Sequence, residues 1–186
     1  YKIERVDSDS IDTKGKFGLI MNSFRNGEID ILVGTQIVSK GLDFSNVTLV
    51  GVISAETTLW IPDFRADERT FQLLTQVAGR AGRSKAEGEV LIQTQNPNNF
   101  TLQKVVTNDY KGFYEREIKM RELNHYPPFA KLALIETKAE DENQARVAAN
   151  QFFNILKAKK VPLFVNDPIP AGIPKIKKNY RFHILI

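Results

Sequence analysis

Ile29-Asp30-Ile31-Leu32-Val33-Gly34 is a short, nearly continuous apolar run, and Val47-Thr48-Leu49-Val50-Gly51-Val52-Ile53 is a second one. Such runs are typical of strands that are covered on both faces of a parallel sheet. Further strands are predicted at residues 2 to 6 and 89 to 94. Strands that alternate with helices form parallel sheets, so residues 1 to 95 are predicted to form an α/β lobe.

Helical patterns separate these strands. One covers residues 14 to 25, and another begins at Asp67 and continues through Ala78. Asp67 is expected to cap the second helix, and Gly79 to close it in the left-handed conformation. The side chains predicted to face inward are Phe17, Ile20, Met21, Phe24, Phe71, Leu74 and Val77 or Ala78.

The pattern changes after Asn96-Pro97, where two helices are predicted, at about residues 98 to 108 and 110 to 124. We interpret residues 96 to 124 as a helical connector. Residues 125 to 186 are predicted to form a small α+β domain of βαββ type, truncated at its end. Its predicted strands are at residues 132 to 137, 162 to 165 and 180 to 186, and a stiff loop with Pro168, Pro170 and Pro174 is expected between the last two. Its predicted helix covers residues 140 to 157, with Ala145, Ala148, Phe152 and Ile155 or Leu156 on one face.

Composition excludes several classes of protein. The 186 residues are 42% hydrophobic and 26% charged, which is an ordinary globular balance and excludes disordered, collagen-like and membrane-spanning chains. There is no cysteine, so a disulfide framework and a thiolate zinc site are excluded, and the isolated His125 and His183 leave no metal-ligand spacing. No charged-then-apolar leader starts the chain, so a cytoplasmic protein is expected.

The net charge of +4 is unevenly distributed. No acidic residue follows Asp167, whereas Lys175, Lys177, Lys178 and Arg181 supply four positive charges there. Together with Tyr180, this cluster is a candidate DNA-binding surface, and a solvated basic loop is the alternative.

The densest chemical signal is Gln76-Val77-Ala78-Gly79-Arg80-Ala81-Gly82-Arg83. If the helix ends at Gly79, Arg80 and Arg83 follow it on a glycine-flanked loop. Guanidinium groups suit phosphate oxygens, whose charge builds during phosphoryl transfer. A glycine-rich turn with solvated arginines is the alternative interpretation.

A second signal follows the strand that ends at Gly34. Ligands of open α/β sheets gather at the carboxyl ends of strands, where Thr35, Gln36 and, after the next strand, Ser54 and Glu56 fall. Thr35 and Lys40 are candidates to hold phosphates, and Asp43 to accept a hydrogen bond from a ribose hydroxyl. The alternative is that Lys40 and Asp43 are ordinary polar residues of a loop.

Leu59-Trp60-Ile61-Pro62-Asp63-Phe64-Arg65 contains the only tryptophan. Aromatic residues interleaved with arginine can stack on bases, although such a segment is more often a packed loop. The chain has no Gly-x-x-x-x-Gly-Lys-Ser/Thr sequence, so it is not expected to hold a triphosphate alone.

Together these residues resemble the C-terminal portion of the PriA (primosomal protein N′) family, superfamily 2 DNA helicases that restart stalled replication forks. Gly34 through Phe44 is similar to motif V of that family, and Gln76 through Arg83 to motif VI. The runs Pro62 to Arg69, Gly88 to Thr94 and Tyr126 to Phe129 are also similar, so the resemblance extends over essentially the whole chain.

The resemblance implies a RecA-like second helicase lobe, partial here, whose ATP site lies between two lobes. The phosphate-binding loop and the Mg²⁺-binding motif belong to the other lobe, and a zinc module precedes this portion in the longer protein. The site residues that it implies are Gln76, Arg80 and Arg83 at the phosphates, Gly41 and Asp43 near the nucleotide, and Thr35, Gln36 and Lys40 toward single-stranded DNA or linking it to ATP.

The function implied is a DNA-stimulated ATPase that translocates 3′ to 5′, recognises forks and directs primosome assembly. Single-stranded and branched DNA, primosome proteins and single-stranded DNA-binding protein are the implied partners, with no membrane. The chain alone is not expected to hydrolyse ATP. The alternative is a non-catalytic DNA-binding or partner-docking module built around Lys175 to Arg181.

Overall fold

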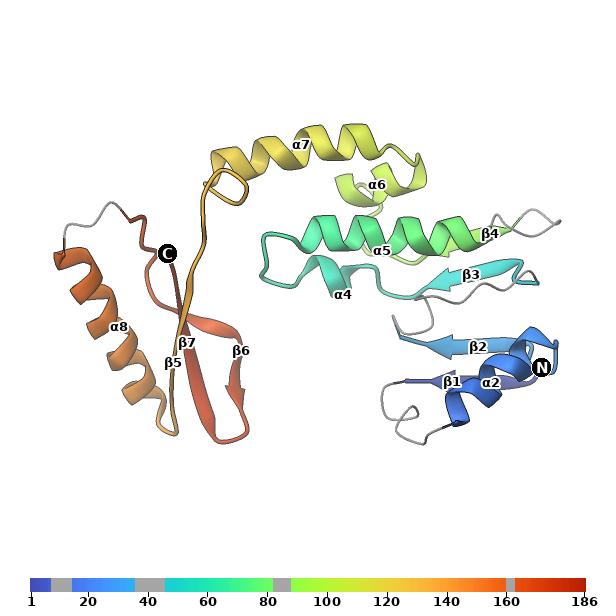
Figure 1. The fold of residues 1–186 in the computed structure, drawn as a ribbon, viewed down its shortest axis with the longest axis horizontal. Coiled ribbons are helices and arrows are strands. Elements are labelled where there is room, and N and C mark those ends of the chain that lie inside the picture. Colours follow the sequence, from blue (N-terminus) through green and yellow to red (C-terminus); the bar gives the residue numbers. More distant parts are fainter. Residues whose placement is uncertain (8–14, 36–45, 82–87, 160–162) are drawn as a thin grey trace. The chain divides into compact units, whose positions relative to one another are not determined.

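The computed structural model describes residues 1–7, 15–35, 46–81, 88–159 and 163–186 (Figure 1). The chain divides into two compact units. Unit 1 comprises Tyr1–Trp60 and Arg65–Phe113, and unit 2 comprises Ile61–Phe64 and Tyr114–Ile186. The domain boundaries predicted near residues 95 and 124 stay predictions.

In unit 1, strands β1 (Ile3–Val6) and β2 (Ile31–Gly34) pair in parallel, with helix α2 (Lys16–Arg25) packed beside them. Ile20 and Met21 of α2 are buried against Val6 and Ile29, and Phe17 and Phe24 pack against this cluster. The inward face predicted for this helix is therefore confirmed.

A second parallel pair in unit 1 joins β3 (Leu49–Val52) to β4 (Glu89–Ile92). Its core is supplied mainly by helices: α4 (Glu56–Leu59), α5 (Ala66–Ala81), α6 (Phe100–Val106) and the first turn of α7 (Tyr110–Leu123). Phe71 of α5 stacks on Phe113 of α7 with ring centroids 4.4 Å apart. Leu74 and Val77 are also buried, as predicted.

The parallel pairing is confirmed, but the strands are not covered on both faces as expected. Ile31 and Val33 of β2 are 43% and 47% exposed, and Leu49 and Leu91 of the second pair are 54% and 52% exposed. Among the described residues, no ladder joins the two pairs into one sheet. The RecA-like arrangement therefore stays a prediction.

Helix α5 is longer than predicted, and its two ends differ from the expectation. It begins at Ala66, so Asp67 lies in the first turn and its Oδ1 accepts a hydrogen bond from Thr101 Oγ1 at 2.5 Å. At the other end Gly79 has no left-handed φ and the helix continues through Arg80 to Ala81. Glycine lowers helix stability without forbidding helix, and the apolar face at Leu74 and Val77 continues to be buried.

Unit 2 contains an antiparallel sheet of order β5-β7-β6, with α8 (Glu142–Ala158) packed on it (Figure 1). The strands are β5 (Leu134–Ala139), β6 (Ile169–Ile176) and β7 (Asn179–Leu185). Ala145 and Ala149 of α8 are buried against Phe182 and Ile184 of β7. The βαββ order is confirmed.

Two details of this unit were predicted wrongly. Residues 163 to 165 are not a strand, and the proline-containing stretch expected to be a loop is β6 itself. Proline lacks an N–H donor, but β6 is an edge strand with a register irregularity between Pro170 and Lys175, where a donor is not needed.

The predicted inward face of α8 was also displaced by one residue. Ala145 is buried as expected, and Leu156, given as the alternative to Ile155, is half-buried. Ala148 is exposed, and Phe152 and Ile155 are 40% and 53% exposed. Ala149 is buried instead, and Phe153 packs against the core. Both apolar rows have helical spacing. The small side chains of Ala145 and Ala149 allow the helix backbone to lie close to the sheet.

In the described part of the chain, no helix combines the length and the hydropathy that crossing a membrane requires.

Candidate functional site

The last turns of α5 carry two of the predicted phosphate-facing residues. Gln76 is exposed, and Arg80 follows four residues later in the same helix. Positions four apart lie on one face of a helix, so the backbone places these two positions together. The third predicted residue, Arg83, lies outside the described residues.

The strand-end candidates are described only in part. Thr35 is exposed directly after β2. Gln36, Lys40, Gly41 and Asp43 lie outside the described residues.

Glu56, the carboxylate expected at the next strand end, is buried and 5% exposed. It accepts hydrogen bonds from Thr94 Oγ1 and from the Gln95 backbone N–H, the latter at 2.7 Å. The bond from Thr94 is the main cause of its lowered pKa, followed by backbone hydrogen bonds. The ionised carboxylate of Glu56, at the start of α4, therefore links the segment that follows β3 to the segment that follows β4.

The basic cluster forms a β-hairpin, which we call the basic hairpin: Lys175 to Arg181. Ile176 pairs with Asn179, so Lys177 and Lys178 form a two-residue turn, with φ of 55° at Lys177. Lys175, Lys177 and Lys178 are exposed. Three ammonium groups at one end of a sheet are suited to a polyanion.

Tyr180 and Arg181, also predicted to contact DNA, make contacts within unit 2. The Lys175 Nζ lies 4.3 Å from the Tyr180 ring centroid and donates to its hydroxyl oxygen at 3.1 Å. Arg181 forms an ion pair with Glu136 of β5 and donates from Nη1 to the Ile173 carbonyl oxygen at 3.3 Å. The structure thus gives Tyr180 and Arg181 roles in holding the basic hairpin, while their DNA contacts stay predictions.

Glu136 contacts Arg181 of the basic hairpin, and it was not identified as a site residue from the sequence. Its Oε2 accepts from Arg181 Nε at 2.9 Å and lies 3.1 Å from His183 Nε2. The hydrogen bond from Arg181, and next the one from His183, lowers the pKa of Glu136. Glu136 stands 45 residues before Arg181, so only the β5–β7 register could have indicated the pair.

Glu136→Gln is expected to destabilise unit 2 at neutral pH and to have no effect in acid. The pKa of Glu136 is lower in the folded state than its ordinary value of 4.5. The carboxylate therefore stabilises the fold fully when the pH is above 4.5, and this contribution is lost as the pH falls through the folded-state pKa. The loss at neutral pH should be no more than about 1 kcal/mol, as for other exposed ion pairs. Urea unfolding followed through the NMR signals of β7 amides at several pH values measures it.

The control for that experiment is Glu140→Gln, which removes an exposed carboxylate just beyond β5. A difference between Glu136→Gln and the unmodified chain that persisted unchanged at pH 2 would contradict the ion-pair account.

The tryptophan-containing segment divides into two parts. Trp60 is 70% exposed. Phe64 belongs to unit 2, where it stacks on Tyr126 with centroids 5.3 Å apart and lies 5.1 Å from the Arg121 guanidinium carbon. Pro62 also packs there, since a Cβ at Gly172 would lie 2.8 Å from it. The packed-loop interpretation is therefore confirmed for Pro62 and Phe64, whereas Trp60 stays accessible.

Comparison with protein families gives two matches, which are separated by residues 86 to 121. Residues 1–85 match the helicase conserved C-terminal domain, and residues 122–186 match the primosomal protein N C-terminal domain. Over 186 residues the chain is 45% identical to the replication restart protein PriA of Bacillus subtilis, with 100% of the chain aligned. The chain belongs to the PriA family.

Other PriA relatives align over similar lengths. The chain is 41% identical over 184 residues to replication restart protein PriA of Synechocystis, and 36% identical over 187 residues to that of Haemophilus influenzae. It spans only about a quarter of the length of the PriA proteins that it matches: 23%, 22% and 26% for these three.

Proposed function

We propose that this chain is the C-terminal part of an ATP-dependent 3′ to 5′ DNA helicase that recognises stalled replication forks and restarts replication. The observation that carries the proposal is that essentially the whole of this chain is similar to part of proteins named replication restart protein PriA. The match of residues 1–85 to a helicase domain favours this function over a non-catalytic docking module.

The α5 face with Gln76 and Arg80 is suited to contact the phosphates of ATP. The C-terminal end of a helix carries a partial negative charge and does not attract anions by itself. A phosphate near this end therefore needs cationic side chains, which Arg80 and Arg83 supply, while the amide of Gln76 is a neutral donor. Bound with Mg²⁺, ATP would supply the γ-phosphoryl group, and its transfer to water would drive translocation.

We assign the other roles by the family resemblance. Gly41 and Asp43 would lie near the nucleotide, and Thr35, Gln36 and Lys40 toward the single strand. The rest of the ATP and Mg²⁺ site, and the zinc site, would belong to other parts of the longer protein. Arg80 would stabilise negative charge in the transition state for hydrolysis, as arginine fingers do.

The basic hairpin is suited to contact single-stranded or branched DNA. Its exposed lysines Lys175, Lys177 and Lys178 would contact phosphates, held in place by the Tyr180 and Arg181 contacts. By the family resemblance, we propose primosome proteins and single-stranded DNA-binding protein as the protein partners.

DNA binding by this chain is expected to depend on salt through the basic hairpin. Each contact between a lysine and a single-strand phosphate contributes about −0.7 to the slope of log affinity against log salt. Replacing Lys175, Lys177 and Lys178 by glutamine should therefore reduce the slope by about 2. Fluorescence anisotropy with a labelled oligonucleotide at several salt concentrations measures it.

The matched control neutralises three exposed lysines elsewhere in unit 2, at Lys119, Lys131 and Lys138. An equal reduction of the slope in both triple variants would assign the effect to net charge. No reduction in either variant would place the DNA contacts outside the basic hairpin.

A further inference from the structure

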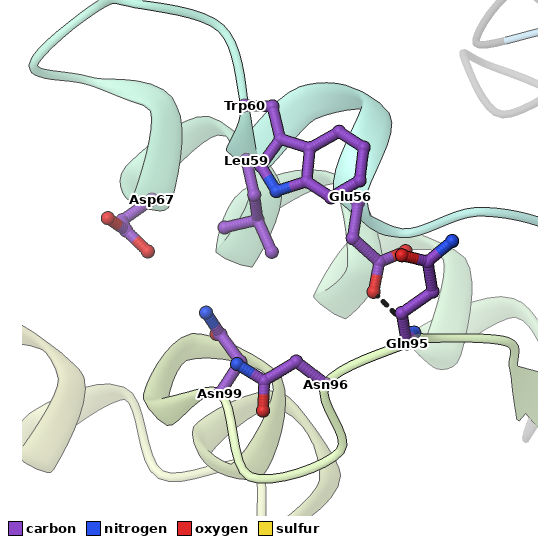
Figure 2. A pocket seen from close by; sticks show the side chains of 7 residues that line it. All are labelled: Glu56, Leu59, Trp60, Asp67, Gln95, Asn96 and Asn99. Atoms are coloured by element: carbon purple, nitrogen blue, oxygen red, sulfur yellow. Dashed lines mark hydrogen bonds between the residues drawn. The ribbon is translucent and has the colours of Figure 1, made fainter.

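Unit 1 contains a cavity of about 420 Å³ that lies outside the proposed ATP and DNA contacts (Figure 2). It lies between the end of α4, the first turn of α5 and the segment that leads from β4 to α6. Its size is within the range of small-ligand sites. Two carboxylates, three amides, an indole and a leucine side chain line it.

The two carboxylates give the cavity a negative charge. Glu56 is buried and held by Thr94 and Gln95, and Asp67 is held by Thr101. No lysine, arginine or histidine is among the described residues that line the cavity. No cationic side chain of the lining therefore pairs with Glu56 or Asp67, and the net charge of the lining favours a cation over an anion as the ligand.

The uncharged residues that line the cavity indicate which kind of cation would fit. In Figure 2 the indole of Trp60 and the side chain of Leu59 lie on one side of the cavity, and Asn96 and Asn99 lie on the opposite side. Tryptophan has the aromatic face that attracts cations most strongly. Amide oxygens such as that of Asn96 accept hydrogen bonds, so the lining offers one ligand both an aromatic ring and hydrogen-bond acceptors.

We propose that this cavity binds the guanidinium group of an arginine side chain on a protein partner. Guanidinium is planar, stacks on aromatic rings and carries five N–H donors, which matches an indole wall with carboxylate and amide acceptors. A lysine ammonium is not planar and stacks less well. A DNA base would bring phosphates close to the carboxylates of Glu56 and Asp67, which disfavours nucleic acid as the ligand.

Trp60 is the only tryptophan of the chain, so its fluorescence reports on this cavity directly. The probe is acetyl-Gly-Arg-Gly-amide added to the 186-residue chain, and the matched probe replaces arginine by citrulline, which has nearly the same shape and no charge. We expect a saturable change with the arginine peptide and none with the citrulline peptide. Oligo(dT) and oligo(dA) are added separately.

Asp67→Asn is expected to weaken binding of the arginine peptide by about tenfold, because a charged hydrogen-bond partner is lost while the bond from Thr101 is retained. Glu142→Gln, which removes a carboxylate in the first turn of α8, should change nothing. The NMR signals of the Trp60 indole N–H and the Asn96 side-chain amide give a second measurement on the unmodified chain.

The proposal is overturned if the arginine and citrulline peptides act alike, if Asp67→Asn and Glu142→Gln bind equally well, or if neither NMR signal moves. It is also overturned if the oligonucleotides change the fluorescence and the arginine peptide does not, since Trp60 would then be a base-stacking site. None of these outcomes depends on ATP hydrolysis, so they are distinguishable from a failure of the proposed helicase function.

Discussion

Arg80→Ala in the full-length protein is expected to lower DNA-stimulated ATP turnover by about 10³- to 10⁵-fold, the range that arginine fingers supply. This corresponds to roughly 4 to 7 kcal/mol of transition-state stabilisation. The physical reason is that the Arg80 guanidinium would stabilise the negative charge of the transition state. Because α5 is continuous through Arg80, helix geometry places this position on the same face as Gln76. DNA affinity should be unchanged, because the basic hairpin lies elsewhere in the chain. Steady-state ATPase assays and DNA-binding titrations on the same preparations measure both.

Two variants act as controls for this loss. Arg80→Lys keeps the charge and removes the planar fork, so its activity should lie between those of the unmodified protein and the alanine variant. Arg25→Ala removes an exposed arginine at the end of α2 and should leave turnover unchanged. The 186-residue chain alone, assayed beside them, should not hydrolyse ATP. Near-normal turnover of Arg80→Ala would remove Arg80 from the phosphate site.

Most elements of the fold could be predicted because each has a local pattern. The apolar spacing at Ile20 and Met21 and at Phe71 and Leu74 identified two helices and their buried faces. Gly79 was misinterpreted because glycine both ends helices and, less often, continues them, and only the packing around α5 decides between the two. In α8 two apolar rows had equal helical spacing, and the packing of small alanines on the sheet selected one.

The proline-rich stretch in unit 2 shows the limit of local rules. Pro170 and Pro174 argue against a central strand, but β6 is an edge strand, and edge position is a property of the whole sheet. Local sequence rules were also insufficient to predict every contact of the basic hairpin. Charge alone located Lys177 and Lys178, whereas the partner of Arg181 depends on the pairing of β5 with β7.

Phe71→Ala is expected to destabilise unit 1 by about 3 to 5 kcal/mol, the usual cost of truncating a buried phenylalanine. Phe71 is 3% exposed, stacks on Phe113 and lies among Leu74, Leu102 and Val105. A cavity left there would border side chains from α5, α6 and α7 at once. A typical domain is stable by only about 5 to 15 kcal/mol, so unit 1 would approach unfolding. Urea unfolding followed by NMR through α6 amides measures the loss.

The same experiment tests whether the two units are stabilised separately. The core around Phe71 and the core around Phe182 and Ile184 share no residue, so the β7 amides of unit 2 should keep their unfolding midpoint in Phe71→Ala. Phe152→Ala is the matched control, because this phenylalanine is 40% exposed and its loss should change stability by only about 0.5 kcal/mol. If the β7 signals shifted together with those of α6, the two cores would unfold as one cooperative unit. In that case a mutation in the helix that carries Arg80 would also weaken the basic hairpin, and the ATPase and DNA-binding measurements could no longer be interpreted independently.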